Sequence, residues 1–123
     1  MPAQIVVVLD EPDFSDRLVT RLGEAGHDAL AVADPLRALD VLEDGSSTDV
    51  LVTSLDHANG KPNGIALALL ARKRCPGIRV LFVGIGHMAH HAAGLGAFLA
   101  VPVTMSEVTE QIIQLLEAGS PAE

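Results

Sequence analysis

The chain contains no tryptophan or tyrosine and only three phenylalanines among its 123 residues. Its apolar content is nevertheless 49%, so a core must be built from Val, Leu, Ile and Ala. A chain of this length is expected to form one domain and can bury a single core without disulfides or metals. We therefore expect one domain over residues 1–123 with an aliphatic core.

Cysteines and long apolar runs are scarce as well. Cys75 is the single cysteine, so no disulfide can form within the chain. No apolar run reaches the roughly 18 residues that a membrane-spanning helix needs. The N-terminus lacks a basic stretch followed by a cleavable apolar segment. We therefore expect a soluble, cytoplasmic protein with no membrane partner.

Positive charge is also limited. Eight Lys and Arg residues face sixteen Asp and Glu residues, which gives a formal net charge of −8. Binding to a nucleic-acid backbone needs clustered Lys and Arg, and the only basic run is Arg72-Lys73-Arg74. That run falls at the expected end of a helix, where the helix dipole favours positive charge. We therefore expect no nucleic-acid partner.

What the sequence does contain is a fivefold alternation of strand-like and helix-like segments. Apolar runs of the kind found in buried strands predict strands over 4–9, 28–32, 50–53, 78–83 and 97–101. Capped or amphipathic segments predict helices over 13–25, 35–44, 64–74, 86–93 and 104–118. The core is expected to span about 4–118, with 119–123 as a flexible tail.

Local signals mark where three of these helices begin. Asp13 is the expected N-cap of the first helix. Asp34 and Pro35 place a capping carboxylate before a proline at the first helical position. Thr104 or Ser106 is expected to cap the last helix.

The order of these segments predicts an α/β fold. Five strand–helix units indicate a doubly wound, five-stranded parallel sheet with helices on both faces, and the flavodoxin-like order 2-1-3-4-5 is the natural candidate. In that order the carboxyl ends of strands one and three flank the topological switch point, where ligands bind and chemistry takes place. The residues expected at this point are Leu9, Asp10, Ser54, Gly84 and Val101.

Four segments of the sequence carry a resemblance to a known family: 5–13, 49–54, 80–84 and 98–102. Together they resemble the receiver (CheY-like) domain of bacterial two-component response regulators, and the resemblance runs from about Gln4 to Ala118. It implies transfer of a phosphoryl group to an aspartate at the end of the third strand. It further implies that two acidic residues after the first strand hold Mg²⁺, while a hydroxyl and a lysine meet the phosphoryl oxygens.

Most positions that carry this chemistry in the family are occupied here by neutral groups. Ser54 stands at the acceptor position. Leu9 replaces one residue of the acidic pair and leaves only Asp10. Gly84 stands in place of the hydroxyl, and Val101 in place of the lysine. Because four of the five positions differ together, we expect a degenerate acceptor site.

The remaining groups predict neither a cofactor nor catalysis. Mg²⁺ needs several oxygen ligands in near-octahedral geometry, and Asp10 is the one carboxylate left to offer, so Mg²⁺ binding is not expected. Ser54 has no obvious activating base and cannot form an acyl phosphate, so we expect no enzyme. His87 and His91 are one turn apart on the expected fourth helix but lack further ligands nearby, so no metal site is expected there.

Asp56 is an alternative phosphoacceptor. The family's spacing from the acceptor to the glycine that opens the third helix is matched better by Asp56 and Gly64 than by Ser54 and Gly64. Asp49 and the step that ends in Ser54 match the family's third strand instead. A slip of two residues keeps side-chain parity, so both assignments stay open at this point.

Phe98 occupies the position of the family's switching aromatic, three residues before the lysine position. Because Gly84 has no hydroxyl with which the ring would move, we expect a ring buried on the fifth strand. The segment between Gly84 and Gly94 is shorter than in typical receivers. A shortened fourth helix is therefore expected to alter the surface through which such domains contact their partners.

These residues favour an atypical receiver, or pseudo-receiver, of a two-component or phosphorelay pathway that acts by protein–protein interaction without Asp phosphorylation. The resemblance implies a histidine kinase, a phosphotransfer protein or another regulator as partner. A homodimer through the face of the fifth strand and the fourth and fifth helices is a further option. The alternatives are a conventional receiver phosphorylated at Asp56 and a flavodoxin-like module that binds a small ligand near Leu9, Gly84 and Val101.

Overall fold

The structure is a computed structural model, and it describes residues 4–43, 48–55, 64–86, 89–92 and 94–117. Within these ranges strands and helices alternate along the chain. The strands are β1 Gln4–Val8, β2 Asp28–Ala31, β3 Val50–Ser54, β4 Arg79–Gly84 and β5 Ala97–Ala100. The helices are α1 Pro12–Glu24, α2 Pro35–Glu43, α3 Gly64–Arg74, α4 Ala89–Ala92 and α5 Met105–Glu117.

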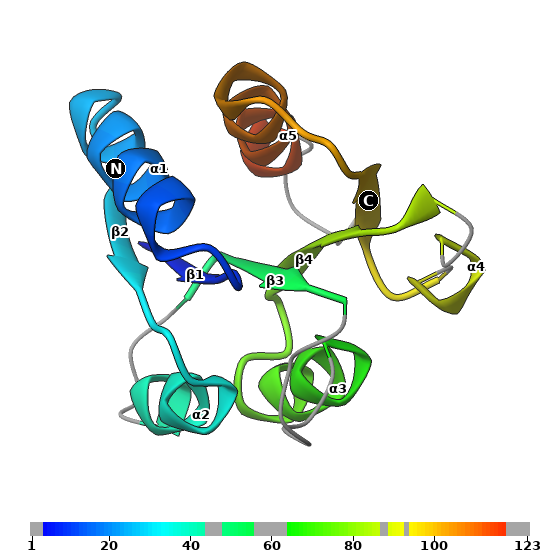
Figure 1. Ribbon diagram of the computed structural model, residues 1–123. Helices are drawn as coiled ribbons and strands as arrows, with labels where there is room; N and C mark the ends of the chain where they lie inside the picture. Colours follow the sequence, from blue (N-terminus) through cyan, green and yellow to red (C-terminus); the bar gives the residue numbers. More distant parts are fainter. Residues whose placement is uncertain (1–3, 44–47, 56–63, 87–88, 93, 118–123) are drawn as a thin grey trace.

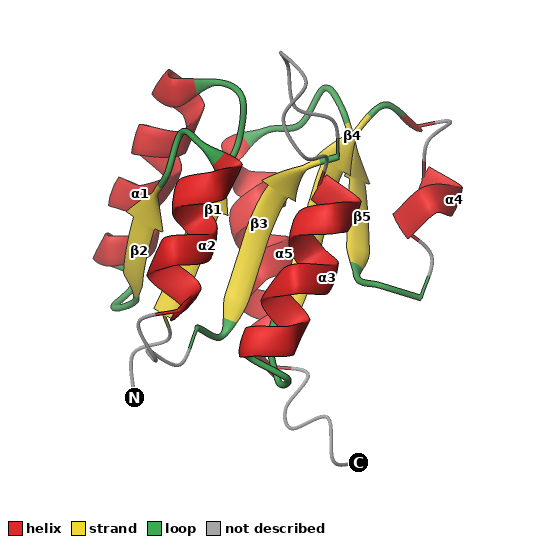
Figure 2. Ribbon diagram, turned by 90° about the horizontal axis from the view of Figure 1, so that it is seen from below, coloured by secondary structure: helices red, strands yellow, loops and turns green. Residues whose placement is uncertain are grey.

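The strands form one sheet in the order β2-β1-β3-β4-β5, and every neighbouring pair is parallel. Helices α1 and α5 cover one face of the sheet and α2 and α3 cover the other, while α4 lies beside the β5 edge (Figure 1). The strands point toward the same edge (Figure 2). The doubly wound α/β fold predicted from the sequence is therefore confirmed, with its strand order.

The core has two layers, one on each face of the sheet. Successive side chains of a strand point to opposite faces. Val6 and Val8 of β1 accordingly join the cluster beneath α2 and α3, together with Phe82. Ile5 and Val7 join the cluster beneath α1 and α5. Apart from Phe82 the fully buried members of both clusters are aliphatic, as the shortage of aromatic residues requires.

Two of the predicted helix starts are present. The N–H of Leu36 donates to Oδ1 of Asp34 over 2.9 Å, so Asp34 caps α2. Thr104 Oγ1 accepts from the N–H of Glu107 over 3.1 Å, and Glu107 Oε1 accepts from the N–H of Thr104 over 2.8 Å. This reciprocal pair is a capping box. Of the two candidates for α5, Thr104 is therefore the cap, and Ser106 lies inside the helix.

The predicted start of α1 was wrong. The N-cap is Glu11, and the helix begins at Pro12. Asp13 instead lies in the first turn, where a negative charge meets the positive end of the helix dipole. The difference arises because Pro12 suits the first helical position, where its missing N–H has no intrahelical partner to lose.

Helix α3 has the predicted boundaries, and the other boundaries outside α4 lie within one residue of expectation. Helix α4 is described over Ala89–Ala92, and residues 87–88 and 93 of the predicted span 86–93 lie outside the described residues. The longest helices, α1 and α5, have 13 residues each. Within the described ranges, no helix combines the length and apolar character that crossing a bilayer requires. The predicted tail over 119–123 lies outside the described residues.

Candidate functional site

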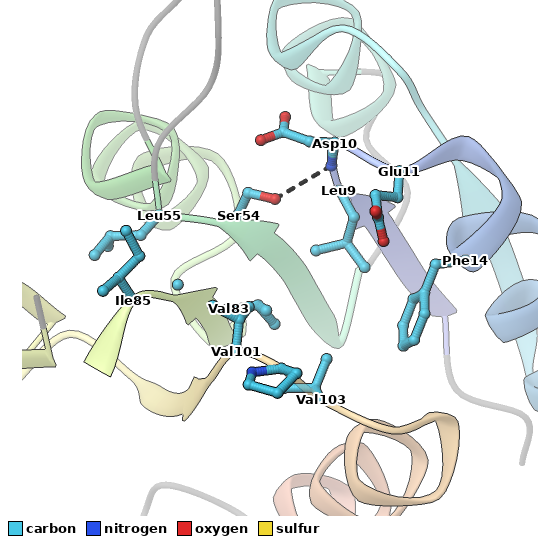
Figure 3. Close-up of a pocket in the computed structure, with 12 residues that line it drawn as sticks. Leu9, Asp10, Glu11, Phe14, Ser54, Leu55, Val83, Ile85, Val101 and Val103 are labelled. Atoms are coloured by element: carbon cyan, nitrogen blue, oxygen red, sulfur yellow. Dashed lines mark hydrogen bonds between the residues drawn. The ribbon is translucent and has the colours of Figure 1, made fainter. Parts of the chain in front are cut away.

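A cavity of about 510 Å³ opens at the carboxyl edge of the sheet, where β1, β3 and β4 end. Its lining residues are Leu9, Asp10, Glu11, Phe14, Ser54, Leu55, Val83, Gly84, Ile85, Val101, Pro102 and Val103. Figure 3 shows how these residues come together from the ends of β1, β3 and β4 and from the segment after β5. All five residues assigned to the switch point from the sequence line this cavity, so the fold brings them together.

Ser54 ends β3 directly beside the chain that leaves β1. The register pairs Val8 with Thr53, so the next residues of the two strands also meet. The backbone N–H of Asp10 donates a hydrogen bond to the Ser54 hydroxyl over 3.2 Å (Figure 3). A neutral hydroxyl thus stands at the end of β3. Asp56, the alternative acceptor, lies outside the described residues.

The loop after β1 offers a poor set of metal ligands. The Leu9 side chain is 9% exposed and belongs to the core beneath α1 and α5. The Asp10 carboxylate points away from the Leu9 and Phe14 side of the cavity, whereas the Glu11 carboxylate points toward it (Figure 3). Within the described ranges, His, Cys, Asp and Glu form no group of three that could hold a metal ion. The residues described here do not fit the near-octahedral oxygen shell of Mg²⁺.

Gly84 is closely packed against Leu55. A Cβ added at position 84 would lie 2.9 Å from Cβ of Leu55 and 3.6 Å from a ring carbon of Phe98. Leu55 is 2% exposed, and its N–H donates to the carbonyl of Val83 over 2.9 Å. The backbone of Leu55 is therefore held in place, and there is no room for a hydroxyl-bearing side chain at position 84.

The sequence reasoning overlooked Leu55. Its only signal was that the apolar run of β3 resumes immediately after Ser54. The close approach continues at Gly64, whose N–H donates to the Leu55 carbonyl over 2.7 Å. A Cβ at Gly64 would collide with the carbonyl oxygen of Ser54. Helix α3 therefore begins directly against the end of β3.

The mouth of the cavity is lined by exposed apolar side chains. Ile85 is 54% exposed and Val101 is 45% exposed. The N–H of Val101 donates to the carbonyl of Gly84 over 2.8 Å, which keeps the two segments together. Where the receiver resemblance places a cationic lysine, the cavity has the branched aliphatic side chain of Val101.

Phe98 is half-buried and not fully buried. Its ring packs against the core cluster beneath α2 and α3. The expectation of a buried ring was therefore only partly correct. Phe98 lies on β5, an edge strand of the sheet that has a neighbouring strand on one side only.

Comparison with known proteins gives structural matches only. No protein-family model and no curated protein matches the sequence. A response regulator receiver protein from Sinorhizobium medicae superimposes with a TM-score of 0.82 at 24% identity, covering 95% of this chain and 96% of that one. A CheY-like receiver domain protein from Methanospirillum hungatei gives 0.80 at 19%, with 96% of each chain covered.

NtrX from Brucella abortus is a larger protein that contains a similar unit. It superimposes with a TM-score of 0.82 at 26% identity, covering 96% of this chain but 28% of NtrX. Together with the strand order and the position of the cavity, these matches show that the chain has the fold of the response regulator receiver domain. The fold implied by the sequence resemblance is therefore correct.

Proposed function

We propose that this chain is a receiver-type signalling domain of a two-component or phosphorelay pathway that works without phosphorylation of an aspartate. The hydrogen bond from the Asp10 N–H to the Ser54 hydroxyl is the observation that carries the proposal. It supports the proposal because the group at the end of β3 is a neutral alcohol engaged with the backbone, where phosphoryl transfer needs a carboxylate nucleophile.

The surroundings of Ser54 support the same conclusion. A transferred phosphoryl group develops negative charge that donors and cations must stabilise. Leu9 offers no ligand, Val101 offers no charge, and Leu55 closes the space at Gly84. We accordingly propose that the chain is not an enzyme and takes no Mg²⁺.

The proposed mode of action is contact with another protein of the pathway, such as a histidine kinase, a phosphotransfer protein or a regulator. On β5, which is an edge strand of the sheet, Phe98 and Leu99 are half-buried. This leaves apolar surface for a partner at that edge of the sheet, and self-association there is the alternative. Light scattering on the purified chain separates a dimer from a monomer that awaits a different partner.

Intact-mass analysis after incubation with acetyl phosphate and Mg²⁺ tests the absence of phosphorylation. We expect the mass to stay unchanged. Among the described residues, the end of β3 offers no carboxylate as nucleophile, and the cavity offers neither a lysine nor a set of metal ligands to support a phosphoryl group. A conventional receiver domain treated in parallel serves as the positive control. A mass gain that disappears in the Asp56→Ala variant would overturn the proposal and establish Asp56 as a phosphoacceptor.

A further inference from the structure

We propose that the cavity at the switch point binds a small organic cation with an apolar body, that is, an alkyl or aryl amine. This inference rests on the proposed function and deepens it, because it assigns a ligand to the site at which the proposed function excludes phosphoryl transfer. It rests on the shape of the cavity, on the exposed apolar side chains at its mouth and on the carboxylate that points into it.

The apolar part of the ligand follows from the walls. A volume of about 510 Å³ falls within the range of small-molecule sites, which are mostly apolar with a few placed polar groups. The apolar side chains that form the walls are Leu9, Phe14, Val83, Ile85, Val101 and Val103. Ile85 and Val101 at the mouth are 54% and 45% exposed. A ligand that covers them removes apolar surface from water, which favours binding.

The cationic part follows from Glu11. Its carboxylate points toward the Leu9 and Phe14 side of the cavity (Figure 3). Glu11 is the N-cap residue of α1, yet its side chain makes no capping hydrogen bond, so the helix does not use the carboxylate. Among the described residues, no Lys, Arg or His lines the cavity. A ligand ammonium group would supply the missing positive charge and a charge-assisted hydrogen bond.

The balance of charge at this end of α1 favours a cation over an anion. The N-terminus of the helix contributes about half a positive charge. Two carboxylates stand at it, Glu11 at the N-cap and Asp13 in the first turn. Their charge exceeds that of the helix end, and the chain as a whole carries −8, which further favours the approach of cations.

Two other ligand classes fit less well. A free phosphate would need cationic groups or several hydroxyl donors. Among the described residues that line the cavity, Ser54 offers the only hydroxyl and there is no Lys, Arg or His. A bare divalent cation would need converging carboxylates, and those of Asp10 and Glu11 point in different directions (Figure 3). Neither ligand would cover the apolar walls. An amine with an aliphatic or aromatic body uses both features.

Titrations of the labelled chain with octylamine, octanol and octanoate test this assignment, because these probes share a chain length and differ in head-group charge. At neutral pH an alkylamine is protonated, as lysine is. We expect the backbone amide resonances of Ser54, Gly84 and Val101 to shift with octylamine, to shift at higher concentration with octanol, and to stay in place with octanoate. Equal binding of the three probes, tighter binding of octanoate, or no shift at all would overturn the proposal.

Two variants locate the interaction, each with a matched control. Glu11→Gln should weaken octylamine binding about tenfold, the effect of one charge-assisted hydrogen bond, and leave octanol binding unchanged. Glu24→Gln at the other end of α1 should change neither. Ile85→Ala should weaken both probes, whereas Leu36→Ala, which is also 54% exposed, should have no effect. A preference for octylamine that survives Glu11→Gln contradicts the assignment.

The result is separable from that of the phosphorylation test. A chain that gains mass from acetyl phosphate and still binds octylamine would overturn the proposed function and retain the amine site. A chain that stays unphosphorylated and binds none of the probes would retain the proposed function and overturn the amine site.

Discussion

Gly84 and Leu55 fit together only because Gly84 has no side chain. A Cβ at position 84 would lie 2.9 Å from the Cβ of Leu55. Real Cβ atoms essentially never approach so closely. The contact involves Leu55 Cβ itself and not the flexible end of the side chain, so rotation of the leucine would not relieve it. A hydroxyl at position 84 therefore requires movement of the β3 end.

The first prediction concerns Gly84→Ala. We expect it to lower the free energy of unfolding by about 1–3 kcal/mol, the usual cost of overpacking. The matched control is Gly23→Ala on α1, where an added Cβ meets nothing within 4 Å. That change should raise the free energy of unfolding by roughly 0.4–1 kcal/mol, because it restricts the unfolded chain. Urea denaturation measures both, and equal effects of the two substitutions would contradict the packing at Leu55.

The second prediction compares two serines. Ser54→Ala removes an acceptor for the Asp10 N–H and should destabilise the fold by about 0.5–1.5 kcal/mol. Ser15 is 4% exposed, and its hydroxyl finds no hydrogen-bond partner among the described residues. Ser15→Ala should therefore stabilise the fold, because it removes an unsatisfied polar group from the core and improves helix propensity. The midpoint of thermal unfolding should fall for Ser54→Ala and rise for Ser15→Ala. A shift in the same direction for both variants would refute either the hydrogen bond at Ser54 or the unpaired hydroxyl at Ser15.

The third prediction concerns the cap of α5. Thr104→Ala removes the hydroxyl that accepts from the N–H of Glu107, although the backbone N–H of residue 104 can still donate to Glu107 Oε1. Loss of the side-chain cap should cost about 1 kcal/mol of stability. Ser106→Ala, one residue inside the helix, should be close to neutral, because Ser106 is exposed and does not serve as the cap. If denaturation showed Ser106→Ala to be the costlier change, the capping assignment would be wrong.

The fourth prediction concerns the missing lysine. Val101→Lys alone should not enable binding of beryllofluoride, because a lysine without an acceptor carboxylate and a metal cannot stabilise the analogue. Binding is expected only when Leu9→Asp and Ser54→Asp are added, since these restore the acidic groups. Fluorine NMR in the presence of Mg²⁺ reports the bound analogue. A bound signal in the Val101→Lys protein would contradict the degenerate site.

Several features of the fold could be predicted because they depend on local sequence. Asp34 followed by Pro35 identified the start of α2, since capping involves residues only two positions apart. The helix over 64–74 was predicted at its observed boundaries. The strand runs were recognisable because strands covered on both faces are apolar throughout, and their alternation with helices implied the order of the sheet.

The start of α1 and the burial of Phe98 could not be predicted in the same way. Asp13 is a preferred type of capping residue, yet the helix begins earlier because Pro12, with its fixed backbone angle, takes the first helical position, and Glu11 becomes the N-cap without a side-chain hydrogen bond. The burial of Phe98 depends on what packs against the edge strand β5, and the sequence around Phe98 does not specify that.

The sequence alone determined the alternation of segments, the parallel sheet and the residues at the switch point, because burial patterns and end signals act over a few neighbouring positions. Only the tertiary structure decided that Ser54 accepts from the Asp10 N–H and that Leu55 excludes a side chain at position 84. It also decided which of the two carboxylates after β1 points into the cavity. These relationships join residues from different strands, and their distances depend on sheet register and packing, which no local pattern specifies.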